Sequence, residues 1–188
     1  MTKADRRQQL LDTAMEIVRD HGTDALTLGA LAESAGVSKP VAYEHFGTRA
    51  GLLTAMYRQI DAKQVRVLLD ALAQSPKRLA DIARIVGNAY MNCYVTVGPE
   101  WHALSAALKG DDQMETVQQE LVDGYVAIYQ EALAPFTRLP DDTLRLRCIG
   151  IYGAGEAIAR DMIRGRTSLG TAASNLTALI ISAVGEPA

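Results

Sequence analysis

The chain has 188 residues, 48% of them hydrophobic and 22% charged, which excludes a disordered chain and a disulfide-dense scaffold. Its formal net charge of −3 excludes binding to nucleic acid through bulk positive charge alone. The charge is uneven, since residues 1–66 carry nine Lys/Arg against eight Asp/Glu and the remainder carries ten against fourteen, so the first part can hold a local basic surface.

The cysteines and the apolar runs predict a compartment. Cys93 and Cys148 are the only cysteines, and they lack CxxC or Cys/His spacing, which argues against structural zinc and suits a reducing environment. The first residues lack the apolar region of a signal peptide, and the apolar run over 179–184 is too short to span a bilayer. We therefore expect a cytoplasmic protein without a metal site, a cofactor or a membrane partner.

Apolar residues recur at helical spacing along the whole chain, and no segment alternates as a half-buried strand does. The sequence therefore predicts an all-α fold. In the first predicted helix, over residues 5–20, Leu10, Ala14 and Ile17 share one face. Gly22 is expected to end this helix, because glycine tolerates the backbone conformation that follows a last turn.

Two short helices are predicted next. Thr27 is expected to cap a helix that ends at Gly36, and Ser38 to cap a third helix that ends at Phe46. Pro40 is tolerated because N–H groups in the first turn of a helix have no intrahelical partner. Two short helices joined by a tight turn, behind a longer helix, are typical of a three-helix unit with a helix-turn-helix that binds DNA.

The remainder of the chain is predicted to be helical as well. Thr48 is expected to cap a long helix, and later Gly, Pro and Asp breaks divide the rest into about five helices, the last two over 141–164 and 168–184. This organisation predicts an N-terminal helix-turn-helix domain over 1–47 and a C-terminal helical domain over 48–188.

One long ordered pattern covers residues 27–53, TLGALAESAGVSKPVAYEHFGTRAGLL. Its distinctive residues are Thr27, Leu31-Ala32, Ala35-Gly36-Val37-Ser38, Tyr43, His45-Phe46, Arg49 and Leu52-Leu53. This pattern resembles the signature of the TetR family of transcriptional regulators. With the preceding helix, the resemblance covers a quarter of the chain. It implies a homodimer that binds operator DNA through the N-terminal domain and a small-molecule effector through the C-terminal domain.

The third helix is the predicted reader of DNA. A turn of 100° per residue places Ala42 inside and leaves Lys39, Pro40 and Tyr43 outside. Lys39 and Tyr43 can donate to phosphate oxygens, while Pro40 and Val41 offer apolar contact to thymine methyl groups. The start of a helix favours a bound phosphate, and the resemblance implies phosphate contacts at Thr27 and Arg49. The candidate DNA-binding residues are Thr27, Ser38, Lys39, Pro40, Val41, Tyr43, His45 and Arg49.

Some of these positions have an alternative interpretation. The helical turn places His45 toward the core with Ala42 and Phe46, which favours a packing role, and only the family resemblance keeps it among the DNA-binding candidates. Thr27 can be a cap and nothing more. The sequence also departs from the commoner family pattern, with Pro-Val-Ala over 40–42 in place of Gly, Thr and Leu, so the resemblance does not transfer an operator sequence. Glu44, beside the DNA face, is interpreted as solvated, with a cytosine amino group or repulsion of non-cognate phosphate as alternatives.

A further hypothesis concerns the basic residues at the start of the chain. Lys3, Arg6 and Arg7 would form a flexible arm that contacts DNA, as basic arms do in the minor groove elsewhere.

Aromatic residues concentrate in the second part of the chain. The candidate ligand-binding residues are Tyr90, Tyr94, Trp101, Tyr125, Tyr129 and Tyr152. Pockets for apolar ligands are lined in this way, but tyrosines spaced four residues apart also pack in ordinary helical cores. The resemblance implies a repressor that a small, largely apolar ligand releases from a palindromic operator, and an activator stays an alternative.

The last two helices are predicted to form the homodimer contact. Small residues on the penultimate helix allow close approach, and apolar residues line the last one: Gly150, Gly153, Ala154 and Ala157, then Leu176, Leu179, Ile180 and Ala183. An isologous contact of four helices fits this pattern. Packing within one subunit is the alternative.

The other function class is an enzyme, or a helical small-molecule-binding module without DNA binding. The sequence has no GxSxG, HExxH or phosphate-binding loop, and its three histidines are scattered. Glu156 and Arg160 are spaced as a helix salt bridge rather than as an acid/base couple. We therefore expect no catalytic residues.

Overall fold

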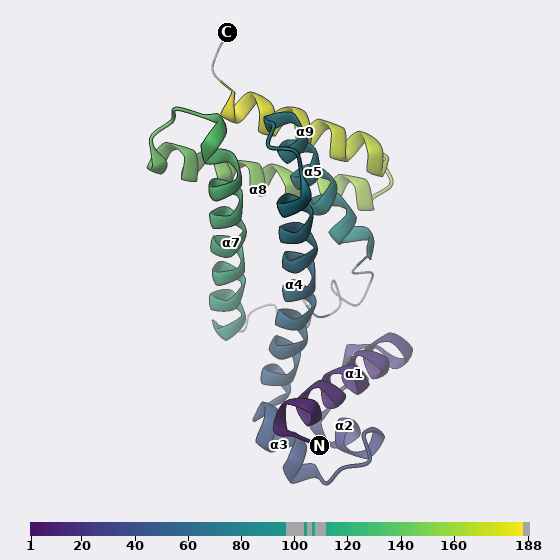
Figure 1. The fold of residues 1–188 in the computed structure, drawn as a ribbon. Helices are drawn as coiled ribbons and strands as arrows, with labels where there is room; N and C mark the ends of the chain where they lie inside the picture. Colours follow the sequence, from purple (N-terminus) through teal and green to yellow (C-terminus); the bar gives the residue numbers. More distant parts are fainter. Residues whose placement is uncertain (97–103, 105–106, 108–111, 186–188) are drawn as a thin grey trace. The chain divides into compact units, whose positions relative to one another are not determined.

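The computed structural model describes residues 1–96, 104, 107 and 112–185, and all regular structure in these ranges is helical. The all-α prediction is confirmed. The elements in chain order (Figure 1) are α1 (Lys3–His21), the 3-10 helix η1 (Thr23–Ala25), α2 (Leu28–Ser34), α3 (Lys39–Phe46), α4 (Arg49–Gln74), α5 (Leu79–Thr96), α7 (Asp112–Leu133), the 3-10 helix η2 (Ala134–Phe136), α8 (Asp141–Ile163) and α9 (Leu169–Val184). None of the described helices is both long and apolar enough to cross a membrane.

The chain forms two compact units. Of the described residues, the first unit comprises 1–62, 104, 107 and 112–117, and the second comprises 63–96 and 118–185. The long helix α4 is continuous and contributes residues to both units. The predicted boundary after residue 47 separates a DNA-binding part of the chain from the rest. The division into compact units does not test this boundary, so it stays a prediction.

Helix α1 begins earlier than predicted because its start is capped twice. The Thr2 hydroxyl accepts a hydrogen bond from the Asp5 backbone N–H, and the Asp5 carboxylate accepts one from the Thr2 backbone N–H. This reciprocal capping box satisfies two donors that a helix start otherwise leaves open. Lys3, Arg6 and Arg7 therefore lie on an ordered helix, and the flexible-arm hypothesis is wrong.

The helix-turn-helix forms as the sequence predicts. Thr27 caps α2, and Gly36 makes the turn at φ 66°, a conformation that favours glycine. The Val37 N–H then donates to the Ala32 carbonyl at 2.9 Å. The core of this unit includes fully or almost fully buried side chains from α1, α2, α3 and α4: Leu10, Ala14, Val18, Leu28, Leu31, Ala42, Phe46, Leu52, Leu53 and Met56.

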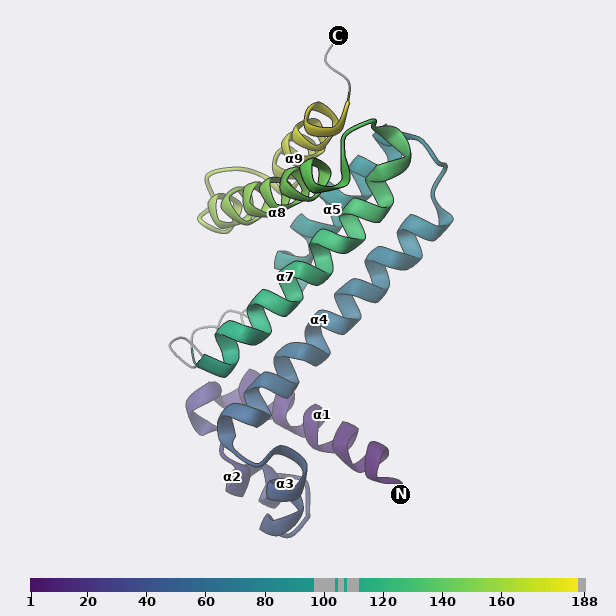
Figure 2. The same cartoon turned by 90° about the vertical axis from the view of Figure 1, so that its left-hand side faces the viewer.

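In the second unit, α9 packs against both α5 and α8 (Figure 2). The contact with α5 is close because of Gly87. A Cβ atom at this position would lie 2.6 Å from Thr177 Oγ1 and 2.9 Å from the Ala173 carbonyl oxygen. Only a residue without a side chain allows the two helix backbones to approach in this way.

We expect Gly87→Ala to lower the free energy of unfolding by about 1–3 kcal/mol, because the added methyl group forces α5 and α9 apart. Denaturant unfolding followed by circular dichroism measures this change. Gly124→Ala on α7 is the matched control, since a Cβ there meets nothing within 4 Å. It should raise stability by up to about 1 kcal/mol. Equal stability of Gly87→Ala and the wild type would contradict the close approach.

Candidate nucleic-acid interface

Helix α3 presents a polar and aromatic face to solvent. Ala42 and Phe46 are buried, whereas Lys39, Pro40 and Tyr43 are exposed, with 54% of Tyr43 accessible. This orientation is the one that the helical periodicity predicts. Within two turns, the exposed face therefore carries two hydrogen-bond donors, Lys39 and Tyr43, and the apolar ring of Pro40.

The side-chain hydroxyl groups of Thr27 and Ser38 lie at the starts of the two short helices, and only the first makes a capping hydrogen bond. Thr27 Oγ1 accepts from the Ala30 N–H at 3.0 Å, so it serves as the cap of α2 while its own proton can be donated elsewhere. Ser38 holds the N-cap position of α3, but its side chain makes no capping hydrogen bond. Both side chains are exposed.

Val41 and His45 are half-buried. The His45 ring lies 6.1 Å from the Phe46 ring, measured between centroids, in a tilted arrangement. This contact supports the packing interpretation of His45, while its partial exposure leaves a phosphate contact open as a proposal.

The first turns of α1 are tied to the end of α3. Arg7 donates from Nη1 to the His45 carbonyl at 2.8 Å, and its guanidinium carbon lies 4.8 Å from the centre of the Phe46 ring. Both contacts stabilise the C-terminal end of α3, where unpaired carbonyls favour a cation. Lys3 Nζ lies 2.9 Å from Glu44 Oε1.

Glu44 is thus paired rather than simply solvated. The hydrogen bond and the charge of Lys3 hold the pKa of the Glu44 carboxyl below its usual value. Sequence reasoning missed the pair because the two residues lie 41 positions apart.

Arg49 has a structural role that the sequence does not reveal. Its Nε donates to the Leu26 carbonyl at 2.8 Å, and its Nη2 donates to the Thr23 carbonyl at 2.6 Å. The guanidinium therefore fastens the segment before α2 to the start of α4. A phosphate contact by Arg49 would have to use its remaining N–H groups.

Five of the six predicted ligand-binding residues come together in the second unit, and Trp101 lies outside the described residues. Tyr90 stacks on Tyr94 at 5.7 Å and meets Tyr152 edge-on at 5.5 Å, measured between ring centroids. Tyr125 lies 6.0 Å from Tyr152 and 6.2 Å from Tyr129. We call these five residues the tyrosine cluster.

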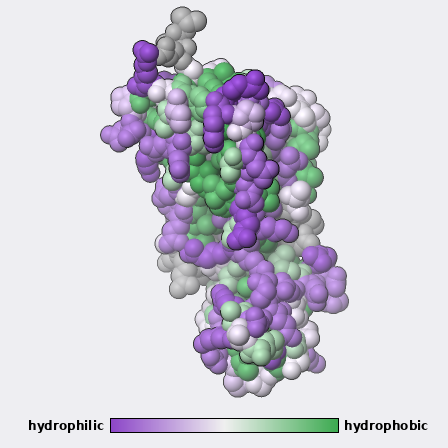
Figure 3. All heavy atoms as spheres, in the orientation of Figure 1, coloured by the Kyte–Doolittle hydropathy of each residue, from purple (hydrophilic) through white to green (hydrophobic). Residues whose placement is uncertain are grey.

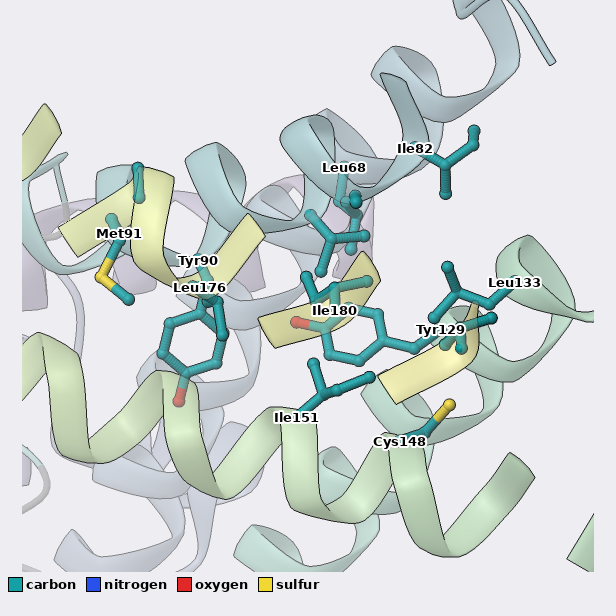
Figure 4. Close-up of a cluster of buried hydrophobic side chains, with 14 of the residues drawn as sticks. Leu68, Ile82, Tyr90, Met91, Tyr129, Leu133, Cys148, Ile151, Leu176 and Ile180 are labelled. Carbon is teal, nitrogen blue, oxygen red and sulfur yellow. The ribbon is translucent and has the colours of Figure 1, made fainter. Parts of the chain in front are cut away.

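Burial divides the tyrosine cluster. Tyr90 and Tyr129 are 9% and 1% exposed and lie among apolar side chains such as Ile151 and Ile180 (Figure 4). Burial raises the pKa of both phenols above the ordinary value. The remaining three, Tyr94, Tyr125 and Tyr152, are half-buried. Only these three therefore combine an apolar ring with an accessible surface.

A groove that the sequence did not predict lies elsewhere in the same unit. Its volume is about 560 Å³, and its walls come from the ends of α4 and α7, the start of α5 and η2. Most of the lining is apolar, including Leu69, Ile128 and Phe136, with Lys77 and Glu131 as charged members. Apolar side chains on one face of this unit are visible as green surface between polar bands in Figure 3. Residues from three separate segments build the groove, so spacing along the chain could not show it.

The described residues offer little for other chemistry. No group of three His, Cys, Asp or Glu residues among them could hold a metal ion. Burial raises the pKa of the Cys148 thiol to about 11, so this thiol stays protonated at neutral pH.

Comparison with known proteins shows what the N-terminal part of the chain resembles. Residues 10–56, from within α1 to the first turns of α4, match the family described as bacterial regulatory proteins, tetR family. The likeness to this family therefore lies in the part of the chain that forms the helix-turn-helix. The match covers all the candidate DNA-binding residues, from Thr27 to Arg49.

This chain is similar to proteins that are named as transcriptional regulators. It is 32% identical over 83 residues to the HTH-type transcriptional regulator BetI of Rhizobium meliloti, a match covering 43% of this chain and 41% of BetI. It is 37% identical over 82 residues to the HTH-type transcriptional activator FasR of Mycolicibacterium smegmatis, covering 42% and 37%. The chain thus matches about two fifths of the length of these relatives.

The fold extends the likeness over nearly the whole chain. The transcriptional regulator FadR from Bacillus subtilis, solved in complex with stearoyl-CoA, superposes with a TM-score of 0.72 at 14% identity. The superposition covers 94% of this chain and 98% of FadR. The second unit therefore has the same helical architecture as well.

We expect Arg49→Lys to lower the free energy of unfolding by about 1 kcal/mol, because lysine keeps the charge but cannot bond both carbonyls. Urea unfolding measures this loss. Arg66→Lys, farther along α4, is the control for exchanging arginine for lysine on an exposed position of the same helix. An unchanged urea midpoint for Arg49→Lys would show that the two carbonyl bonds are dispensable.

Proposed function

We propose that this chain is a sequence-specific DNA-binding transcriptional regulator that represses by binding a palindromic operator and leaves it when a small, largely apolar ligand binds. The exposed face of α3 carries the proposal, because a helix fits the major groove and its Lys39 and Tyr43 are donors. The tetR-family match of this domain and the regulator relatives support it. An operator-binding regulator works where the bacterial chromosome lies, so the proposal includes a cytoplasmic location.

Base reading is assigned to the first turns of α3 in this proposal. Pro40 and Val41 contact thymine methyl groups, and Lys39 reads guanine acceptors or a phosphate. Thr27, Ser38, Tyr43 and His45 contact the sugar-phosphate backbone and fix the register.

The first test is selection from a randomised duplex pool with purified protein, followed by affinity measurements on the enriched site at several salt concentrations. We expect a palindrome, and an affinity that falls steeply as salt rises. Lys39→Met should weaken binding by about tenfold, whereas Lys63→Met, an exposed lysine on α4, should change it little.

Enrichment of no sequence at low salt would overturn the proposal. The chain would then be a helical small-molecule-binding module without DNA binding.

The dimer contact is assigned to the outer faces of α8 and α9. Leu146, Ile149 and Leu179 are 66%, 38% and 47% exposed, so α8 and α9 both keep large apolar side chains outside the core of their own subunit. On α8, a Cβ atom at Gly150 or Gly153 would meet nothing within 4 Å, so a partner helix can approach closely. Such a face, shared by two copies, forms an isologous contact.

The predicted dimer residues on α9 need a correction. Leu176 and Ile180 are 0% exposed and belong to the core of their own subunit, because the side of α9 that carries them packs against α5 and α8. The outward side carries Leu179 and Ile181.

We expect Gly153→Arg to convert the dimer to a monomer, because a long charged side chain would stand in the helix contact. Sedimentation velocity at several protein concentrations measures the change. Gly124→Arg on α7 is the matched control, since that position is equally open. A Gly153→Arg protein that still sediments as a dimer would move the interface elsewhere.

The effector is assigned to the half-buried part of the tyrosine cluster: Tyr94, Tyr125 and Tyr152. Their rings offer apolar surface, and their hydroxyl groups offer a few polar contacts, as in ligand sites generally. A FadR of the same fold was solved with stearoyl-CoA, whose stearoyl chain is apolar. In a dimer, the two α3 helices bind the operator only when their separation matches that of its half-sites. A ligand that prefers a state with another separation therefore weakens DNA binding by linkage. Helix α4 contributes residues to both units, so it is the element that can transmit this preference.

A further inference from the structure

The Lys3–Glu44 ion pair lies at the edge of the exposed face of α3. Lys3 is the first residue of α1, and Glu44 is on α3, one turn after Pro40. The side chains are 73% and 64% exposed, respectively. An ion pair this exposed contributes little to folding, so its removal should leave the domain folded.

Both members of the pair are held in place. The capping box of Thr2 and Asp5 fixes the backbone at Lys3. One turn later, Arg7 binds the carbonyl of His45, the residue that follows Glu44. These contacts hold the backbones of the two helices together and so keep the Lys3 side chain within reach of the Glu44 carboxylate.

The pair leaves one side of the carboxylate available. Lys3 bonds Oε1, and a carboxylate has two oxygens that each accept hydrogen bonds. A bare carboxylate near DNA would be repelled by phosphates, which would turn it away from the groove. A fixed lysine offsets this repulsion and limits the rotamers of the glutamate. In the major groove, a carboxylate accepts a hydrogen bond from the N4 amino group of cytosine.

We propose that Lys3 is a positioning residue that holds the Glu44 carboxylate for the amino group of a cytosine in each half-site. This inference rests on the proposed function, since it assigns one base contact within that interface. Lys3 acts through Glu44, so its removal should change base preference rather than only total affinity.

The test compares the affinities of four proteins for the enriched duplex and for its single-base variants. The proteins are the wild type, Lys3→Met, Glu44→Ala and the double variant. We expect one position in each half-site where the wild type prefers cytosine by on the order of tenfold. Glu44→Ala should abolish this preference, Lys3→Met should reduce it to about twofold, and the double variant should match Glu44→Ala.

Arg6→Met is the charge-matched control, because Arg6 lies in the same turn of α1 but bonds Gln9 instead of Glu44. It should leave the cytosine preference intact. The same result for Lys3→Met, with total affinity reduced equally on every duplex, would mean that Lys3 contacts only phosphate, and it would overturn the inference. A cytosine preference that survives Glu44→Ala would overturn it too.

These outcomes are separable from failure of the proposed function. If the wild type enriches no duplex, the regulator proposal and this inference fall together. If it enriches a palindrome with no position sensitive to Glu44→Ala, only this inference fails.

Discussion

Burial of Ala42 and Phe46 against the rest of the first unit is the constraint on which the interface depends. With these two side chains inside, the 100° turn per residue leaves Lys39, Pro40 and Tyr43 outside. Helix α3 has only eight residues and would be marginal in isolation, so tertiary packing supplies its stability. The surface proposed to read DNA is therefore a by-product of how the core is filled.

Polar contacts between side chains and backbone also hold the segments of the first unit in place. Arg7 and Arg49 each donate to backbone carbonyls, one at the end of α3 and the other before α2. Both bonds join segments that are distant in sequence, and both use an arginine that could otherwise serve as a free cation. Some basic residues of this unit, such as Arg7 and Arg49, therefore bond the backbone, whereas others, such as Lys39, are exposed to solvent.

The second unit shows the same division between packing and surface. Tyr90 and Tyr129 fill the core between α5, α7, α8 and α9, and the Tyr90 ring lies against Gly155, where a Cβ atom would approach to 3.1 Å. The other tyrosines of the cluster keep an accessible side. On α8, the buried glycine admits a ring, whereas Gly150 and Gly153 face outward. One side of this helix is therefore packed against a ring, while the other side is open for the proposed dimer contact.

The sequence alone determined the local features. Helical spacing predicted the helices, Thr27 and Gly36 predicted the boundaries of α2, and the 27–53 pattern indicated the resemblance to the tetR family, because these signals depend on neighbours within a few residues. Only the tertiary structure decided which residues meet across long separations. The Lys3–Glu44 pair, the carbonyl partners of Arg49, the groove beside Leu69 and the inward side of α9 all depend on helix packing. Spacing in one chain specifies which side of a helix is apolar, but not which helix will cover it.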